Sequence, residues 1–293
     1  MIDAITLAEL GAVGVVAGSL GATVGIGGGV LLVPALTLLF HVSPHVAVAT
    51  SLLGVVATST AAGSVYVGSG MANMRLGMAL EIATTVGGLL GGLAAAHVSS
   101  EALGACFGVL LVLVAILLLR GHDSRASESP AKGLGTYPTG WEERGRLGGA
   151  YYDEREQRLV TYQAVRWPIG AAISLLAGLA SGLFGVGGGF LKVPAMAFGM
   201  RVPLRVAAAT SNFMIGVTAG SSLFVYFQRG FLEPVLAAPA VLGVVAGSLV
   251  AARVAGRLPT HALRILTASV LLAVAVEMIL HATQKMSGGH GAA

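Results

Sequence analysis

The chain has 293 residues, of which 55% are hydrophobic and 10% are charged, and its mean hydropathy is +0.85. Soluble domains carry about 25% charged residues, so this composition excludes an ordinary water-soluble enzyme. Fourteen of the 30 charged residues lie within residues 121–166, which leaves 16 for the other 247 residues. The sequence therefore predicts an all-α polytopic protein whose solvent, outside that central segment, is the lipid bilayer.

The net charge of +4 comes from basic residues that are scattered singly along the chain. They form no patch with interleaved aromatic residues, so we expect no nucleic-acid partner and interpret the arginines as membrane-boundary residues. The one cysteine, Cys106, permits neither an intrachain disulfide nor a cysteine metal site. The sequence has no Ser/His/Asp set, HExxH motif or paired intramembrane carboxylates. We therefore expect no enzyme activity, no metal and no cofactor.

The first apolar run, residues 8–23, lacks the basic start and cleavage site of a signal peptide, so we interpret it as a membrane segment. Seven long apolar runs follow, and most can span about 30 Å of hydrocarbon as helices. They cover residues 46–67, 76–96, 102–119, 168–184, 206–227, 235–252 and 262–280. Two further runs, 30–40 and 190–200, have only 11 residues and are too short to span.

The charged segment 121–166 is rich in Gly and Pro and ends in a predicted β-hairpin, in which AYYD and RLVTY flank EREQ. It has too little apolar content for a core of its own, so we expect a cytoplasmic inter-repeat loop rather than a regulatory domain. The chain then divides into a first membrane repeat (1–120), this loop (121–166), a second membrane repeat (167–282) and a short tail (283–293).

An internal duplication is the strongest pattern in the sequence. GIGGGVLLVPA at residues 25–35 recurs as GVGGGFLKVPA at residues 185–195, an offset of 160 residues. The same offset, without a gap, pairs Val42 with Val202, Thr50 with Thr210, Ser51 with Ser211, Tyr66 with Tyr226 and Gly87 with Gly247. The two halves are therefore predicted to be copies of one fold.

The arginines favour an orientation for these copies. If each half crossed the membrane four times, four arginines of the second half would lie outside, against the positive-inside tendency. The short run can instead add a fifth crossing or the return arm of a re-entrant hairpin. In that case the cytoplasmic side holds Arg75, the central loop and all four arginines of the second half, namely Arg201, Arg205, Arg253 and Arg257. We predict two inverted-topology repeats of about five segments each, with both termini outside and the short Gly-interrupted helices meeting near the membrane midplane.

The duplicated glycine loops are candidate anion sites. Each loop stands at the start of a short helix near Val30 or Phe190, where unpaired N–H groups and the helix dipole attract negative charge. Close helix packing is the alternative role of such glycines. The hydroxyl and amide residues that follow each short helix are candidate donors, or else helix caps. The predicted substrate-binding residues are Gly27, Gly28, Gly29, Thr50, Ser51, Gly187, Gly188, Gly189, Lys192, Thr210, Ser211 and Asn212.

Charged residues within the apolar runs have two interpretations. Lys192 either supplies positive charge to an anion or reaches the membrane interface from a short helix, and the sequence leaves both open. Glu81 and Glu277 lie within about two turns of segment ends, so we expect them at the membrane boundary rather than as proton carriers. They are not related by the repeat, because the offset places Val241 opposite Glu81.

The pattern GxxxGxGGGxLxVPxL, used twice and followed by ATS, resembles the sulfite exporter TauE/SafE family, also called the toluene-sulfonate uptake permease family. The resemblance covers both membrane halves. It implies a multi-pass plasma (inner) membrane transporter that exports small sulfur-containing oxyanions or organosulfonates, such as sulfite or sulfoacetate. Some relatives are assigned other small carboxylate or sulfur substrates, so a carrier for those compounds stays open as an alternative.

Transport by alternating access around the glycine loops fits this resemblance, and an anion channel with the same loops is its rival. No ATP-binding Walker motif is present, so the energy must come from an ion gradient, the membrane potential or the substrate gradient. The expected partners are a small anionic substrate and the lipid bilayer. Protons or another coupling ion, and a homodimer, remain open.

Overall fold

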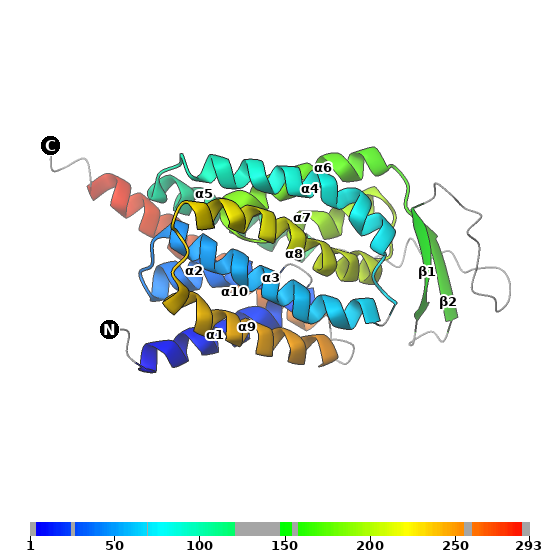
Figure 1. The fold of residues 1–293 in the computed structure, drawn as a ribbon, viewed down its shortest axis with the longest axis horizontal. Helices are drawn as coiled ribbons and strands as arrows, with labels where there is room; N and C mark the ends of the chain where they lie inside the picture. Colours follow the sequence, from blue (N-terminus) through cyan, green and yellow to red (C-terminus); the bar gives the residue numbers. More distant parts are fainter. Residues whose placement is uncertain are drawn as a thin grey trace.

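The computed structural model describes residues 4–24, 27–68, 70–120, 147–153, 158–254 and 260–288. These residues form an elongated helical bundle with a small β-hairpin at one end (Figure 1). The first half contains α1 (Ala4–Val24), α2 (Gly29–Leu39), α3 (Pro44–Gly68), α4 (Met74–Ala95) and α5 (Ser100–Arg120). The second contains α6 (Trp167–Phe184), α7 (Gly189–Pro194), the π-helix η2 (Ala195–Gly199), α8 (Leu204–Gln228), α9 (Pro234–Val254) and α10 (Thr260–Gly288).

Six of the described helices are long and apolar enough to cross a membrane, namely α1, α3, α4, α5, α6 and α9. This finding confirms a polytopic all-α membrane protein. Helix α8 has 25 residues but is more polar, because it carries the buried Thr210, Ser211 and Asn212 in its interior face. The short runs are also as predicted, since α2 has 11 residues and the other run is divided between α7 and η2.

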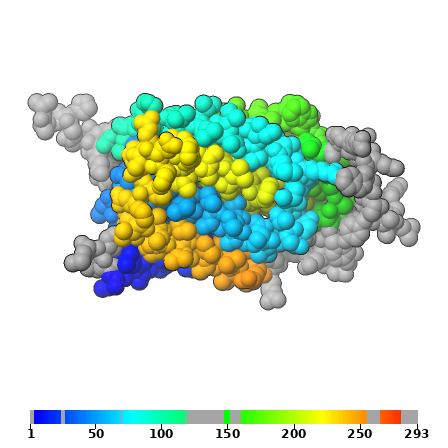
Figure 2. Space-filling view, viewed as in Figure 1, coloured from blue at the N-terminus to red at the C-terminus, as the bar shows by residue number. Residues whose placement is uncertain are grey.

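Each half packs one of its helices against the other half in the same way. By the repeat, α1, α3 and α4 correspond to α6, α8 and α9. Helix α9 of the second half packs against α1 and α3, and its counterpart α4 of the first half packs against α6 and α8. The remaining large contacts join equivalent helices, α3 with α8 and α5 with α10. Figures 1 and 2 show α4, α8, α3 and α9 side by side in that order across one face. The duplicated sequence thus corresponds to a duplicated set of helix contacts.

Glycines allow the closest of these contacts. A Cβ atom on Gly14 or Gly18 of α1 would meet the carbonyl of Ala240 or Val244 in α9. Along α4, Gly87 and Gly91 meet the carbonyls of Leu175 and Leu179 in α6 in the same way. Small residues let helix backbones approach in a membrane, where apolar side chains alone give little preference for protein over lipid. Most glycines therefore serve packing.

The direction of the helices follows from the order of these contacts. The residue numbers of the contacting positions increase in the same direction along α1 and α9, and again along α4 and α6. Each of these two pairs therefore runs parallel. In contrast, Gly63 and Ser59 of α3 lie beside Asn212 and Gly216 of α8, respectively, so these two helices run antiparallel. In Figure 1, α1 begins and α10 ends at one end of the bundle, and the hairpin lies at the other.

The predicted hairpin is confirmed as β1 (Gly148–Asp153) and β2 (Arg158–Gln163), which pair antiparallel with Tyr151 opposite Val160. Both of these side chains are buried in a cluster with Leu76 of α4, Met196 and Met200. The side-chain amide of Asn73 donates to the Tyr162 hydroxyl at 3.0 Å, which ties β2 to the start of α4. The rest of the predicted central loop, residues 121–146 and 154–157, lies outside the described residues.

Candidate functional site

Each glycine loop turns the chain back from a long helix into a short one. Helix α2 begins at Gly29 and α7 at Gly189, one residue earlier than the sequence predicted. Gly27 and Gly187 have positive φ values of 84° and 74°, a region that other L-residues rarely adopt. The loops are not identical, because Gly188 also has a positive φ of 72° whereas its counterpart Gly28 has a helical φ of −64°.

The two loops converge on one pair of side chains at the middle of the bundle. A methyl group on Gly27 would lie 3.1 Å from Ile215 Cδ1 and 3.6 Å from Val55. On Gly187 it would lie 2.8 Å from Val55 Cγ1 and 3.3 Å from Ile215 Cβ. Val55 and Ile215 are themselves related by the repeat and lie near the middle of α3 and α8. The expected meeting of the two glycine loops is therefore seen.

Ser51 joins the loops to the long helices. Its hydroxyl donates to the Gly185 carbonyl at 2.7 Å. A Cβ atom on Gly29 would meet that same carbonyl and would lie 2.6 Å from Ser51 Oγ. Residues from the start of α2, from α3 and from the second glycine loop are thus in direct contact.

Two other candidate donors are buried without a hydrogen-bond partner in the described part of the chain. They are the hydroxyls of Thr50 and Ser211, both 0% exposed. The amide oxygen of Asn212, an acceptor, is also unpaired, whereas the Asn212 Nδ2 donates to the Ala208 carbonyl at 3.2 Å. Leaving a buried polar group unpaired costs about 1–3 kcal/mol. Such groups are therefore free to bind a ligand.

Thr210 is in a different place. Its hydroxyl accepts a hydrogen bond from the Asn73 N–H at 2.9 Å, and its methyl group faces Gly77 of α4. Thr210 therefore contacts the start of α4 and not the glycine loops, although its neighbour Ser211 is unpaired. The backbone carbonyl of Asn212 is also occupied, since it accepts from Ser59 Oγ at 2.6 Å.

The structure places Lys192 and Glu81 inside the bundle and in contact with the same residue, Thr218. Lys192 is fully buried, and its Nζ donates to Thr218 Oγ1 at 2.7 Å. Glu81, about two turns after the start of α4 at Met74, is only 8% exposed. Thr218 Oγ1 donates to Glu81 Oε1 at 2.7 Å, and Lys192 Nζ lies 3.7 Å from Glu81 Oε2.

This cluster of Glu81, Thr218 and Lys192, hereafter the charged triad, adjoins the converging loops. Lys192 follows Gly189 by three residues, and Thr218 follows Ile215 by three residues, which is less than one helical turn. Sequence reasoning missed Thr218 and the pairing. The available signal was one lysine and one carboxylate within apolar runs, because opposite charges in such segments tend to pair with each other. Glu277, the other candidate carboxylate, is exposed on α10.

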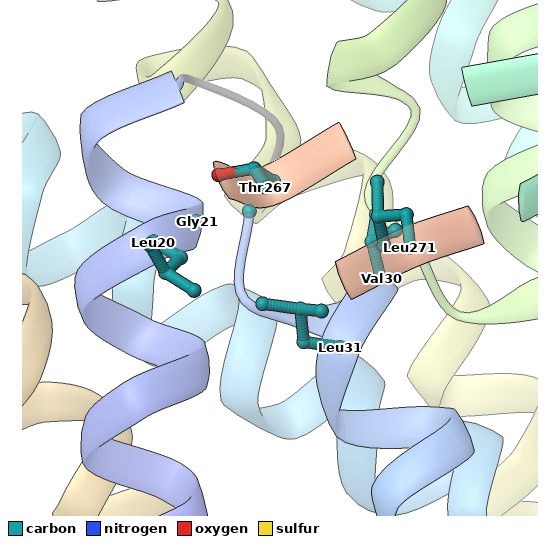
Figure 3. A pocket seen from close by; sticks show the side chains of 7 residues that line it. Leu20, Gly21, Val30, Leu31, Thr267 and Leu271 are labelled. Carbon is teal, nitrogen blue, oxygen red and sulfur yellow. The ribbon is translucent and has the colours of Figure 1, made fainter. Parts of the chain in front are cut away.

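A small pocket lies beside the first glycine loop, between α1, α2 and α10 (Figure 3). Apolar side chains such as Leu20, Val30 and Leu271 form much of its lining, together with Gly21, Gly27, Leu31 and Thr267. Thr267 is 4% exposed, and its hydroxyl has no hydrogen-bond partner in the described part of the chain. The pocket therefore adds one more unpaired hydroxyl beside the start of α2.

Among the described residues, no group of three or more His, Cys, Asp or Glu side chains is arranged to hold a metal ion. His45 has a structural role, because both of its ring nitrogens have hydrogen-bond partners in the protein. They lie 3.2 Å from Ser100 Oγ and 3.1 Å from the Ala95 carbonyl. Its ring also stacks on Phe231.

Comparison with known proteins identifies the family of this chain. Residues 10–278 match the family model for the sulfite exporter TauE/SafE. The chain is 28% identical over 273 residues to the probable membrane transporter protein YunE of Bacillus subtilis, covering 91% of this chain and 94% of that protein. It is 27% identical over 278 residues to a probable membrane transporter protein of Xylella fastidiosa, covering 94% of each. No solved structure matches significantly.

The family match covers both repeats, both glycine loops and the charged triad. The six membrane-length helices agree with the transporter names that the relatives carry. This chain is therefore a multi-pass membrane transporter that belongs to the TauE/SafE sulfite exporter family.

Proposed function

We propose that the protein is a secondary transporter that exports small sulfur-containing oxyanions or organosulfonates, such as sulfite or sulfoacetate, across the plasma membrane. One observation carries this proposal, namely that two glycine loops, each at the start of a short helix, face the same pair of side chains in the middle of the bundle. Helix starts attract anions through their N–H groups and dipole. Two helix starts that face the same point suit a small, strongly charged anion.

The proposed substrate site comprises the residues around this convergence. The N–H groups of Gly28, Gly29, Gly187, Gly188 and Gly189 face the anion, whereas the Gly27 N–H donates to the Gly21 carbonyl at 3.2 Å and shapes the first loop. The unpaired hydroxyls of Thr50 and Ser211 and the second amide N–H of Asn212 complete its hydrogen bonds, and Ser51 holds the second loop through the Gly185 carbonyl. Lys192 supplies positive charge, and Thr210 supports Ser211 from the side of α4. A sulfonate remains ionised at physiological pH, so such a site needs donors and positive charge, not an acid that protonates the substrate.

The two halves are proposed to be inverted-topology repeats that rock against each other around this site. The antiparallel directions of the equivalent helices α3 and α8 support the inversion. The hairpin end of the bundle is assigned to the cytoplasm, with both termini outside. Arg75 lies two residues after Asn73, whose side chain contacts Tyr162 of the hairpin, and Arg201 follows Met200, whose carbonyl accepts from the Val165 N–H. Arg75, Arg201, Arg205 and Arg253 are all exposed, which agrees with the positive-inside tendency.

Counterflow in proteoliposomes tests the function. Vesicles that contain the purified protein and unlabelled sulfoacetate should take up labelled sulfoacetate, and protein-free vesicles should not. Sulfite, thiosulfate, taurine and sulfate, added outside in turn, should rank by competition. Saturable counterflow is the expected result for a transporter, since a channel produces none. Absence of counterflow for all five compounds by folded protein would contradict the proposal.

A further inference from the structure

The charged triad is an ion pair within a membrane bundle. Ionisable residues in membrane segments are costly and tend to mark ion or substrate pathways. A buried pair adds little net stability, because removing two charges from water offsets their attraction. The triad therefore needs an explanation other than folding.

The repeat-related positions of the triad support this argument. The repeat places Leu32 of α2 opposite Lys192, Thr58 of α3 opposite Thr218 and Val241 of α9 opposite Glu81. Thr58 Oγ1 donates to the Gly54 carbonyl in its own helix, at 3.0 Å. The fold is thus built with apolar side chains at one set of repeat-related positions and with a charge pair at the other. Charge at these positions is not a requirement of the architecture.

The geometry leaves one oxygen of Glu81 uncommitted. Oε1 accepts from Thr218 at 2.7 Å and from Thr85 at 3.3 Å. Oε2 is buried and has no hydrogen bond in the described part of the chain, and Lys192 Nζ lies beyond hydrogen-bond distance from it at 3.7 Å. Lys192 instead donates to Thr218. The lysine therefore neutralises Glu81 without holding Oε2.

We propose that Glu81 Oε2 binds a proton when an anion at the converging loops draws Lys192 away, so that one proton crosses the membrane with each anion. This inference rests on the proposed function. An anion at the loops attracts the Lys192 ammonium, which leaves a buried carboxylate without a counter-charge. The carboxylate then takes a proton from the compartment to which the site is open. After the site opens to the other side, the anion leaves, Lys192 returns to Glu81, and the proton is released there. A dianion such as sulfoacetate keeps one net negative charge when it travels with one proton, so a membrane potential that is negative inside drives this cycle toward export.

No other described ionisable side chain offers itself for this role. Helix α6 and η2 contribute none within their bounds, and α7 contributes only Lys192. Arg75 of α4 and Arg205 of α8 are exposed. Tyr226 of α8 donates its hydroxyl hydrogen to the carbonyls of Gly182 and Leu183. Tyr151 of the hairpin is buried in the neighbouring cluster with Leu80.

The experiment separates exchange from proton-driven accumulation, with labelled sulfoacetate as the probe. When the pH is the same inside and outside the vesicles, counterflow requires no net proton movement. It therefore tests the proposed transport function alone. Accumulation is then measured under a pH gradient that is acidic outside, with the membrane potential clamped by potassium and valinomycin. One proton per anion predicts about tenfold accumulation per pH unit for the wild-type protein. A pH-sensitive dye inside the vesicles should record acidification that accompanies uptake.

Glu81→Gln is the decisive variant, because glutamine keeps an oxygen for Thr218 but cannot exchange a proton. It should retain counterflow and lose both the accumulation and the dye signal. Glu277→Gln, which changes the exposed carboxylate of α10, should accumulate sulfoacetate like the wild type. If Glu81→Gln does not fold, the double variant Glu81→Val with Lys192→Leu gives both positions the residues of their repeat counterparts, and it should show weaker counterflow without accumulation.

Three results would overturn the inference. Wild-type counterflow without accumulation under the pH gradient would refute coupling and leave the proposed function intact. Tenfold accumulation per pH unit by Glu81→Gln would remove Glu81 from the coupling. Absence of wild-type counterflow would overturn the proposed function and the coupling together.

Discussion

The two halves of the chain share one backbone plan, but the two repeat-related corners of the bundle differ in chemistry. At one corner, α7 and α8 of the second half and α4 of the first half bring together Lys192, Thr218 and Glu81. At the other corner, the corresponding positions are Leu32 and Thr58 of the first half and Val241 of α9. The glycine loops, by contrast, are present in both halves and face the same two side chains. In the proposed mechanism the duplicated loops form the anion site, and the charged triad supplies a proton-binding carboxylate at only one of the two corners.

The largest effect should come from breaking the charge pair on one side only. Lys192→Leu or Glu81→Val alone leaves an uncompensated buried charge and should reduce the free energy of unfolding by about 3–5 kcal/mol. The double variant, which gives both positions the apolar residues of their repeat counterparts, should recover most of that loss. Denaturant titration in detergent, as a double-mutant cycle, measures the coupling. Additive single losses would show that the two charges do not interact.

The bridging threonine should differ from its repeat counterpart. Thr218→Val removes a hydroxyl that joins Lys192 to Glu81 and should cost about 1–3 kcal/mol. Thr58→Val removes only a bond to a carbonyl in its own helix and should change stability by about 0.5 kcal/mol or less. Melting of the two variants side by side gives the comparison. Equal losses would mean that the triad adds no special constraint on α8.

The glycine loops should respond alike in the two halves. Gly27→Ala and Gly187→Ala force a side chain into positive φ and toward Val55 and Ile215, at a cost of about 1–2 kcal/mol each. Both should lower sulfoacetate counterflow. Gly199→Ala is the matched control, because a methyl group there meets no atom within 4 Å. Unchanged counterflow in both loop variants would separate the loops from transport.

The two repeated serines should separate a loss of stability from a loss of substrate affinity. Ser51→Ala leaves the buried Gly185 carbonyl without its donor and should cost about 1 kcal/mol. Ser211→Ala removes a hydroxyl that has no partner and should leave the melting temperature unchanged or slightly higher. Its sulfoacetate affinity should nevertheless fall, as measured by competition in the counterflow assay. A stability loss at Ser211 with unchanged affinity would point to a structural role.

Much of the fold could be predicted from local patterns. The 160-residue repeat indicated that equivalent loops meet, and alternating residues around EREQ indicated the hairpin. The charged triad could not be predicted, because Glu81 and Lys192 lie 111 residues apart in different halves. Their contact depends on how α4 packs against the second half, which periodicity does not specify. In the sequence, the lack of a repeat-related carboxylate opposite Glu81 argued against Glu81 as an ion carrier. The structure shows that Glu81 pairs instead with Lys192, a residue at an unrelated position of the repeat.

The most direct test of the central claim is substrate protection at the loop convergence. Ser211→Cys is made in a Cys106→Ser background and treated with a membrane-permeant thiol reagent in proteoliposomes, with and without sulfoacetate. Arg229→Cys, at the exposed end of α8, is the control. The account predicts that sulfoacetate slows labelling at position 211 and leaves position 229 unaffected. Equal labelling rates at position 211 with and without sulfoacetate, in protein that still performs counterflow, would contradict it.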